Sequence, residues 1–125
     1  MFLKIQNTRK EKIFMKYHFI LATKEFLFEV EAVEEVLRER AHYYTTRNKQ
    51  VDFWLLPSPQ FLTPYLTQIK KLTNNISFQN LVAIVSTDAD FIYWLKLRYQ
   101  NVISGHFNSP SEKIPQPLAT VKKVK

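Results

Sequence analysis

The clearest hydrophobic pattern in the chain lies in its second half, where a buried strand runs directly into a helix. Residues Leu81–Val85 form a continuous apolar run of strand length, rich in β-branched side chains. Such a run predicts a central strand that is covered on both faces. Thr87 follows as a candidate N-cap, and Asp88 and Asp90 place negative charge at the positive end of a helix dipole. We therefore expect a helix that starts near Asp88.

The spacing of apolar residues in this helix predicts which side faces the core. At 100° per residue, one stripe collects four residues, Phe91, Ile92, Leu95 and Tyr99. Trp94 and Leu97 fall on the opposite side, and Arg98 falls between Phe91 and Trp94. An arginine at an aromatic border can cover apolar surface with its stem, and its position alone favours that role. The alternative is an anchor for a partner protein, because Arg and Trp are frequent at binding hot spots. The helix is followed by a short strand-like run, Val102–Phe107.

The first half of the chain also has a strand pattern and a helix pattern, both weaker than those of the second half. A short apolar run, Tyr17–Ala22, predicts a strand. A helix is predicted from Val30 to Tyr44 by a buried stripe at three-and-four spacing, formed by Val30, Val33, Leu37, Ala41 and Tyr44. The acids of its first half, including Glu31, Glu34 and Glu35, lie away from this stripe and have no histidine at metal-ligand spacing. They indicate a solvated helix face.

A second strand, Val51–Leu56, precedes two prolines. Alternation places Val51, Phe53 and Leu55 on one face and Asp52, Trp54 and Leu56 on the other. Asp52 is the charged residue on two largely apolar faces. We expect it at the exposed end of the strand, where it caps a neighbour or presents a charge beside Phe53. Pro64 restricts the next helix, in Gln60–Leu72, to its second half.

Charge and composition narrow the possible functions. The chain has 125 residues, which predicts one domain, and no cysteine, which excludes disulfides, thiol nucleophiles and Cys-based metal sites. Its net charge of +7 belongs to the ends, because residues 17–107 are neutral. We therefore divide the chain into a basic extension (1–14), one domain (15–118) and a basic tail (119–125). Basic tails alone favour loose, salt-sensitive attraction, so nucleic acid is not the expected partner. No run is long enough for a transmembrane segment.

The sequence assembles no catalytic constellation. His18, His42 and His106 lie on different predicted elements, with neither a nucleophile nor a metal-ligand spacing nearby. The single glycine, Gly105, excludes phosphate-binding glycine loops. An aromatic content of 14% in a neutral domain is typical of a dense core with an adhesive patch. We expect no enzyme activity, no cofactor and no metal site.

Five blocks of the sequence resemble a family that is found in cyanobacteria and plastids. The likeness extends from about Met15 to Leu118, and within it the blocks occur in the family's order: Glu31–Arg40, Asp52–Leu55, Ala83–Thr87, Phe91–Arg98 and Pro110–Leu118. The family is the accessory protein of the aerobic magnesium-protoporphyrin IX monomethyl ester oxidative cyclase. The differences lie mainly at residues 1–14 and in the loop Leu72–Asn80, outside these blocks.

The resemblance implies both a fold and a function. The order of elements alone favours a parallel α/β sheet, but the resemblance implies an α+β fold with a single four-stranded antiparallel sheet flanked by helices. It implies a non-catalytic factor that binds the di-iron cyclase subunit, and by extension other chlorophyll-biosynthesis enzymes, in the plastid stroma or cyanobacterial cytoplasm. Association with thylakoid or envelope membranes would then be peripheral, through the partner. The partner-binding residues that we expect are Asp52, Phe53, Trp94 and Arg98.

An alternative reading is a tetrapyrrole-binding carrier that delivers the cyclase substrate. It rests on the aromatic excess and on His42 or His106 as an axial ligand to magnesium. The sequence leaves open whether Asp52 and Arg98 pair with each other inside the fold, which would make them a structural pair.

Overall fold

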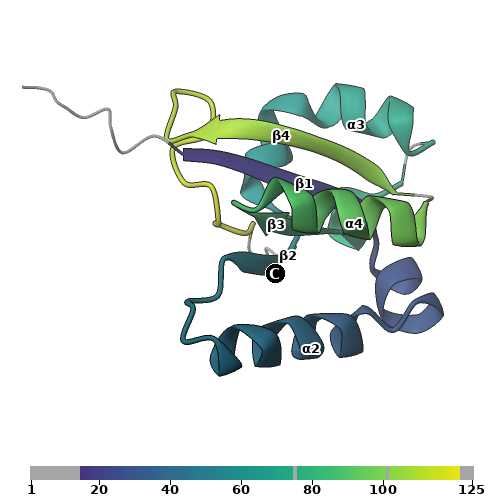
Figure 1. Cartoon of the computed structure of the whole chain (residues 1–125). Helices are drawn as coiled ribbons and strands as arrows, with labels where there is room; N and C mark the ends of the chain where they lie inside the picture. Colours follow the sequence, from purple (N-terminus) through teal and green to yellow (C-terminus); the bar gives the residue numbers. More distant parts are fainter. Residues whose placement is uncertain (1–14, 75, 101, 122–125) are drawn as a thin grey trace, which may run out of the picture.

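The fold is built around one four-stranded sheet in which every neighbouring pair of strands is antiparallel. The computed structural model describes residues 15–74, 76–100 and 102–121. The strands lie in the order β2-β3-β1-β4 (Figure 1). Their bounds are β1 Met15–Thr23, β2 Phe53–Pro57, β3 Leu81–Ser86 and β4 Ile103–Ser109. The structure confirms the α+β class with a single antiparallel sheet.

The parallel sheet favoured by element order is wrong, for a specific topological reason. β3 and β4 are joined by helix α4 (Ala89–Tyr99) and run in the same direction, as in a β-α-β unit. However, β1 is inserted between them and pairs antiparallel with both. Likewise β1 and β2, joined through helix α2 (Val33–Thr46), run in the same direction with β3 between them. Two interlocked split β-α-β units give the ferredoxin-like arrangement.

Different elements cover the two faces of the sheet. α2 and α4 pack with the sheet in one hydrophobic cluster, which includes Leu37, Ile84 and Leu95. The other face is covered by the 3₁₀ segment η4 (Gln60–Tyr65) and helix α3 (Leu66–Leu72), which lead through η5 (Phe78–Asn80) into β3. In Figure 1, α2 and α3 accordingly lie on opposite sides of the sheet. The division between η4 and α3 falls just after Pro64, which confirms that this proline restricts the helix to the second half of the segment.

The structure confirms the burial that the sequence predicted for β3, for the two faces of β2 and for α4. All six residues of β3 are buried, as expected of a strand with neighbours on both edges and cover on both faces. In β2 the expected alternation holds, because Phe53 and Leu55 face the α2 and α4 side and Trp54 and Leu56 face the α3 side. The predicted core stripe of α4 is also buried: Phe91, Ile92, Leu95 and Tyr99.

Gly105 has a packing role at the sheet edge. It lies opposite Phe19 in the β1–β4 register, and a Cβ atom at this position would approach the Phe19 ring to 2.8 Å. The ring packs in turn on Phe61, with centroids 4.9 Å apart. The absence of a side chain at residue 105 therefore lets an aromatic ring lie against the β4 backbone.

The start of the first helix differs from the prediction. Residues Phe26–Val30 form a short π-helix, η3, and Ala32 then adopts a left-handed conformation with φ of 50° before α2 begins at Val33. The change of direction at Ala32 removes Val30 from the buried stripe, and its side chain is 64% exposed. The rest of the predicted stripe faces the core, with Val33, Leu37 and Tyr44 buried and Ala41 packed against them.

The predicted N-cap of α4 is also wrong by one residue. Asp88, not Thr87, has the extended backbone of a cap, and its carboxylate accepts hydrogen bonds from the backbone N–H groups of Asp90 at 3.0 Å and Phe91 at 3.4 Å. The hydroxyl of Ser86 accepts the backbone N–H of Asp88 at 2.9 Å, as expected of a capping serine. This turn fixes the position of the Asp88 carboxylate.

The C-terminal segment runs over the α3 side of the sheet. Ile114 is buried there and Leu118 packs beside it. Residues 119–121, placed by the sequence in a tail, bond to the start of η4 and to the residues just before it. Gln60 N–H donates to the Ala119 carbonyl at 2.9 Å, and Val121 N–H donates to the Ser58 carbonyl at 2.9 Å. The extension 1–14 and residues 122–125 lie outside the described residues, so the domain boundaries stay a prediction.

Candidate functional site

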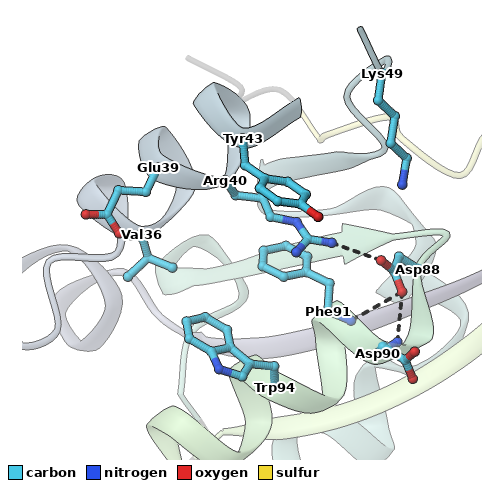
Figure 2. A pocket seen from close by; sticks show the side chains of 9 residues that line it. All are labelled: Val36, Glu39, Arg40, Tyr43, Lys49, Asp88, Asp90, Phe91 and Trp94. Carbon is cyan, nitrogen blue, oxygen red and sulfur yellow. Dashed lines mark hydrogen bonds and ion pairs between the residues drawn. The ribbon is translucent and has the colours of Figure 1, made fainter. Parts of the chain in front are cut away.

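A groove of about 560 Å³ lies between α2 and α4, on the side of the sheet away from α3 (Figure 2). Its α2 wall and its α4 wall each contribute apolar and charged side chains. The lining residues are Val36, Glu39, Arg40, Tyr43, Lys49, Asp88, Asp90, Phe91 and Trp94.

Arg40 occupies the centre of this groove and connects its two walls. Its Nη2 donates to Asp88 Oδ2 on the far wall at 2.9 Å, and its Nε donates to the Tyr44 hydroxyl at 3.1 Å. The guanidinium also lies over the Phe91 ring, 4.3 Å from the centroid, and 4.9 Å from the Tyr44 centroid. Figure 2 shows the side chain extending from α2 toward Asp88. A planar cation with several donors suits this combination of ring stacking and directed hydrogen bonds.

A second hydrogen bond extends the network to the start of β2. The Tyr44 hydroxyl donates to Asp52 Oδ1 at 2.6 Å, and Lys49 Nζ lies 3.7 Å from Asp52 Oδ2. Burial and the Asp52 carboxylate raise the pKa of Tyr44 to about 12, against a smaller opposing effect of Arg40. Tyr44 therefore stays protonated at neutral pH and keeps its proton available for Asp52.

Asp88 has two roles in the same network. One carboxylate oxygen caps α4 and the other accepts from Arg40. The result is a continuous chain of contacts, Lys49–Asp52–Tyr44–Arg40–Asp88, which joins α2, the residue before β2, and the first turn of α4. These contacts connect the two walls of the groove at its base.

Two of the predicted partner-binding residues lie on the surface next to this groove. Trp94 forms part of the α4 wall, is 47% exposed, and stacks on Phe91 with an interplanar angle of 15°. Arg98 is exposed one turn further along α4, with its guanidinium 5.7 Å from a Trp94 ring. Together they extend the groove wall along the outer face of α4.

The other two predicted residues lie beneath the groove. Phe53 is buried and packs between the Tyr44 and Phe91 rings, at centroid distances of 6.0 and 5.5 Å. Asp52 has its two carboxylate oxygens directed at Tyr44 and Lys49. Across the residues that the structure describes, no hydrogen bond or ion pair joins Asp52 to Arg98. Of the four predicted residues, Trp94 and Arg98 therefore lie at the surface, and Phe53 and Asp52 lie below them.

Sequence reasoning missed the three residues that organise the groove, Arg40, Tyr44 and Asp88. Tyr44 was expected only as part of a core stripe, Asp88 only as a charge that complements a helix dipole, and Arg40 only as part of a block that resembles the family. The one local signal was the spacing of Arg40 and Tyr44, four residues apart on the same helix, which allows their side chains to meet. The Arg40–Asp88 pair is separated by 48 residues and has no local signal.

Comparisons with known proteins agree with this fold and identify the family. Residues 15–109 match the Ycf54 protein family. The chain belongs to the Ycf54 family. A Ycf54-like protein of Synechocystis sp. is 43% identical over 114 residues, which cover 90% of this chain and 83% of the relative. The chloroplastic YCF54 protein of Arabidopsis thaliana is 36% identical over 77% of this chain and 44% of its own length.

A solved structure supports the same assignment. The crystal structure of a protein of Nostoc sp. PCC 7120 superposes with a TM-score of 0.78 at 44% identity, covering 87% of this chain and 98% of that one. The Ycf54 family match confirms the resemblance that the five sequence blocks indicated. Relatives occur in cyanobacteria and in chloroplasts. Over the part of this Ycf54 family member that the structure describes, no helix is long and apolar enough to cross a membrane.

The histidines of this Ycf54 family member lie outside the groove. His18 and His106 face each other across β1 and β4, with ring centroids 5.9 Å apart, although the sequence showed them as isolated. His42 is exposed on α2. Within residues 15–74, 76–100 and 102–121, no three His, Cys, Asp or Glu side chains gather in a way that could hold a metal ion.

The His18 environment predicts a loss of stability in acid. Burial, and then the positive charges of Lys16 and His106, lower the pKa of His18 below its ordinary 6.5, while Asp88 opposes the shift. The unfolded chain therefore takes up this proton first as the pH falls below about 6.5, and the folded state is destabilised until the folded pKa is passed. We expect the fall in Tm between about pH 7.5 and about pH 5 to be smaller in His18→Gln than in the wild type. His42→Gln, on the exposed face of α2, is the control and should keep the wild-type pH profile.

Proposed function

We propose that this protein is a non-catalytic accessory factor that binds the di-iron subunit of the aerobic magnesium-protoporphyrin IX monomethyl ester oxidative cyclase. Binding would support formation of the isocyclic ring in chlorophyll synthesis. The proposal rests on membership of the Ycf54 family together with one observation, the exposed Trp94 and Arg98 beside the α2–α4 groove. Tryptophan and arginine that are exposed next to a hollow are typical anchors of a protein interface.

The bonding of Asp88 and Asp52 favours a structural role for these two carboxylates over acid–base chemistry. Asp88 uses one oxygen to cap α4 and the other for Arg40, and the Asp52 oxygens face Tyr44 and Lys49. A general base needs a free lone pair within reach of a substrate. Carboxylates that are already committed to helix capping and ion pairing instead hold surfaces in place. The site would act in the plastid stroma or cyanobacterial cytoplasm, at a membrane only through the partner.

A tetrapyrrole carrier is the alternative function. The aromatic walls formed by Tyr43, Phe91 and Trp94 suit a flat macrocycle. However, neither His42 nor His106 lines the groove, so the expected axial ligand to magnesium is not supplied there. Absorbance titration with the cyclase substrate tests this function, and a saturable spectral change that Trp94→Ala removes would support it over the accessory-factor proposal.

The accessory-factor proposal predicts that the groove wall is needed for capture of the cyclase. We expect Arg98→Ala and Trp94→Ala to weaken binding of the purified di-iron subunit by roughly tenfold or more, as at other interface anchors. Arg38→Ala is the matched control, because Arg38 is exposed on α2 and does not line the groove. Affinity is measured by surface-immobilised capture, with circular dichroism of each variant to verify folding. A wild-type protein that does not bind the subunit would refute the proposal.

A further inference from the structure

The charges at the groove differ from those of the chain as a whole. The chain carries a net charge of +7, yet the groove is lined by three acids and two bases. Arg40 is paired with Asp88, and Lys49 lies within ion-pair distance of Asp52. This leaves the side chains of Glu39 and Asp90. Both are exposed, and neither carboxylate has a hydrogen bond or ion pair to another described side chain. Among the lining residues, the charge outside these ion pairs is therefore negative, while two cations that do not line the groove, Arg47 and Arg98, lie beside the Tyr43 and Trp94 rings.

These two acids lie on opposite walls, with apolar surface between them. Glu39 comes from α2 and Asp90 from the first turn of α4. Figure 2 shows them at opposite ends of the groove, with the Tyr43, Phe91 and Trp94 rings in the space between. Tyr43 and Trp94 are 46% and 47% exposed, which is unusual for such large apolar side chains that face each other across a hollow.

Each exposed ring lies against a neighbouring side chain, as a preformed receptor would require. Trp94 stacks on Phe91, which lies under the Arg40 guanidinium, and the Arg47 guanidinium lies 4.3 Å from the Tyr43 ring centroid. An apolar side chain that inserts between Tyr43 and Trp94 would bury both rings without first having to order them. Preformed walls reduce the entropic cost of binding.

We propose that the α2–α4 groove binds a segment of the partner protein in which an apolar or aromatic side chain is flanked by lysine or arginine on both sides. The apolar side chain would insert between Tyr43 and Trp94, and the flanking cations would pair with Glu39 and Asp90. Cations are also attracted to the face of an exposed tryptophan. An anionic group, such as a carboxylate or a phosphate, at either of these two positions would meet Glu39 or Asp90 and be repelled.

This inference rests on the proposed function, because it takes the di-iron cyclase subunit as the protein that supplies the segment. The charges of Glu39 and Asp90 specify the chemistry of this segment, which is positive at both ends and apolar in the middle. Because the rim acids are exposed, they should act mainly on association rate and selectivity and depend on salt, whereas the buried anchor should determine the lifetime of the complex.

The test uses overlapping 15-residue peptides that span the di-iron cyclase subunit, together with the intact subunit. The full-length wild type is compared with a rim reversal, Glu39→Lys with Asp90→Lys, and with a matched reversal of exposed acids outside the groove, Glu34→Lys with Glu35→Lys. We expect the wild type to retain peptides with the basic–apolar–basic pattern, the rim reversal to bind them at least tenfold more weakly, and the matched control to bind them like the wild type.

A milder variant and a spectroscopic probe distinguish a loss of peptide binding from a loss of folding. Glu39→Gln with Asp90→Asn removes the charges without reversing them and should give an intermediate loss. In a Trp54→Phe background, Trp94 becomes the single tryptophan of the chain, so its fluorescence should change when a retained peptide is added. No fluorescence change on binding would place the peptide elsewhere and overturn the groove assignment.

The outcomes separate this inference from the proposed function. If the wild type and the rim reversal bind the intact subunit equally while Arg98→Ala binds weakly, the groove assignment is wrong and the accessory role stands. If the retained peptides are acidic, or if the rim reversal changes only self-association in sedimentation, the proposed occupant is wrong. If the wild type binds neither subunit nor peptides, the proposed function itself fails.

Discussion

Replacing Arg40 by alanine is expected to lower the free energy of unfolding by about 2 kcal/mol. The change removes a hydrogen bond to Asp88, a hydrogen bond to Tyr44 and a guanidinium stacked on Phe91. Asp88 then loses its cationic partner next to the first turn of α4. The side chains of the pair are 25% and 28% exposed, so water compensates part of the lost attraction. Most of the effect therefore comes from lost packing and unmade hydrogen bonds.

Two further variants separate these contributions. Arg40→Lys keeps the charge but cannot reproduce the planar contact with Phe91 together with two directed hydrogen bonds, so it should recover less than half of the loss. Arg38→Ala, on the exposed side of α2, should change stability by less than about 0.5 kcal/mol. Urea unfolding followed by circular dichroism measures all three. An Arg40→Ala variant as stable as Arg38→Ala would show that the network contributes little to folding.

The parts of the fold that were predictable from the sequence are those with a short-range pattern. The unbroken apolar run Leu81–Val85 predicted a strand buried on both faces, and the period of α4 predicted both its buried stripe and the exposure of Trp94. The alternation of β2 was equally local. In each case the core side of an element follows from the spacing of its own residues.

Strand order could not be obtained in the same way. Whether β3 pairs with β4 or with β1 depends on contacts between residues far apart in sequence, and the local pattern of a β-α-β unit is the same in both arrangements. The family resemblance, not periodicity, supplied the antiparallel sheet. The left-handed Ala32 is a similar case, because alanine gives no local signal for a positive φ and the apparent helical stripe continued through it to Val30.

The candidate site also has a part that was predictable from local sequence and a part that was not. Arg98 could be placed beside Trp94 from helix geometry, and the structure puts the guanidinium 5.7 Å from a Trp94 ring. The local pattern showed Asp52 only as a charge on an apolar strand, and its expected role in partner binding came from the family resemblance. Its actual neighbour, Tyr44, comes from the preceding helix, and the bond between them depends on how α2 packs on β2. Whether the expected residues bind a partner stays a prediction.

The position of Asp52 leads to a prediction about how it supports binding. Its carboxylate accepts a hydrogen bond from Tyr44, whose hydroxyl in turn accepts from Arg40 in the groove floor. Asp52 should therefore act as a positioning residue and not as a direct contact. We expect Asp52→Ala and Tyr44→Phe each to weaken binding of the di-iron cyclase subunit by roughly tenfold, and the double variant to bind no more weakly than either single variant.

Non-additivity is the decisive readout, because a residue that only stabilises the fold would not show it in binding. If Asp52 acts through Tyr44, removing the Tyr44 hydroxyl already removes everything that Asp52 contributes to the groove. Arg38→Ala serves as the control, since Arg38 is exposed on α2, does not line the groove and leaves the bond between Tyr44 and Asp52 in place. A Tyr44→Phe variant with wild-type affinity, beside an Asp52→Ala variant that binds weakly, would mean that Asp52 touches the partner directly. The binding surface would then extend beyond the α2–α4 groove to the start of β2.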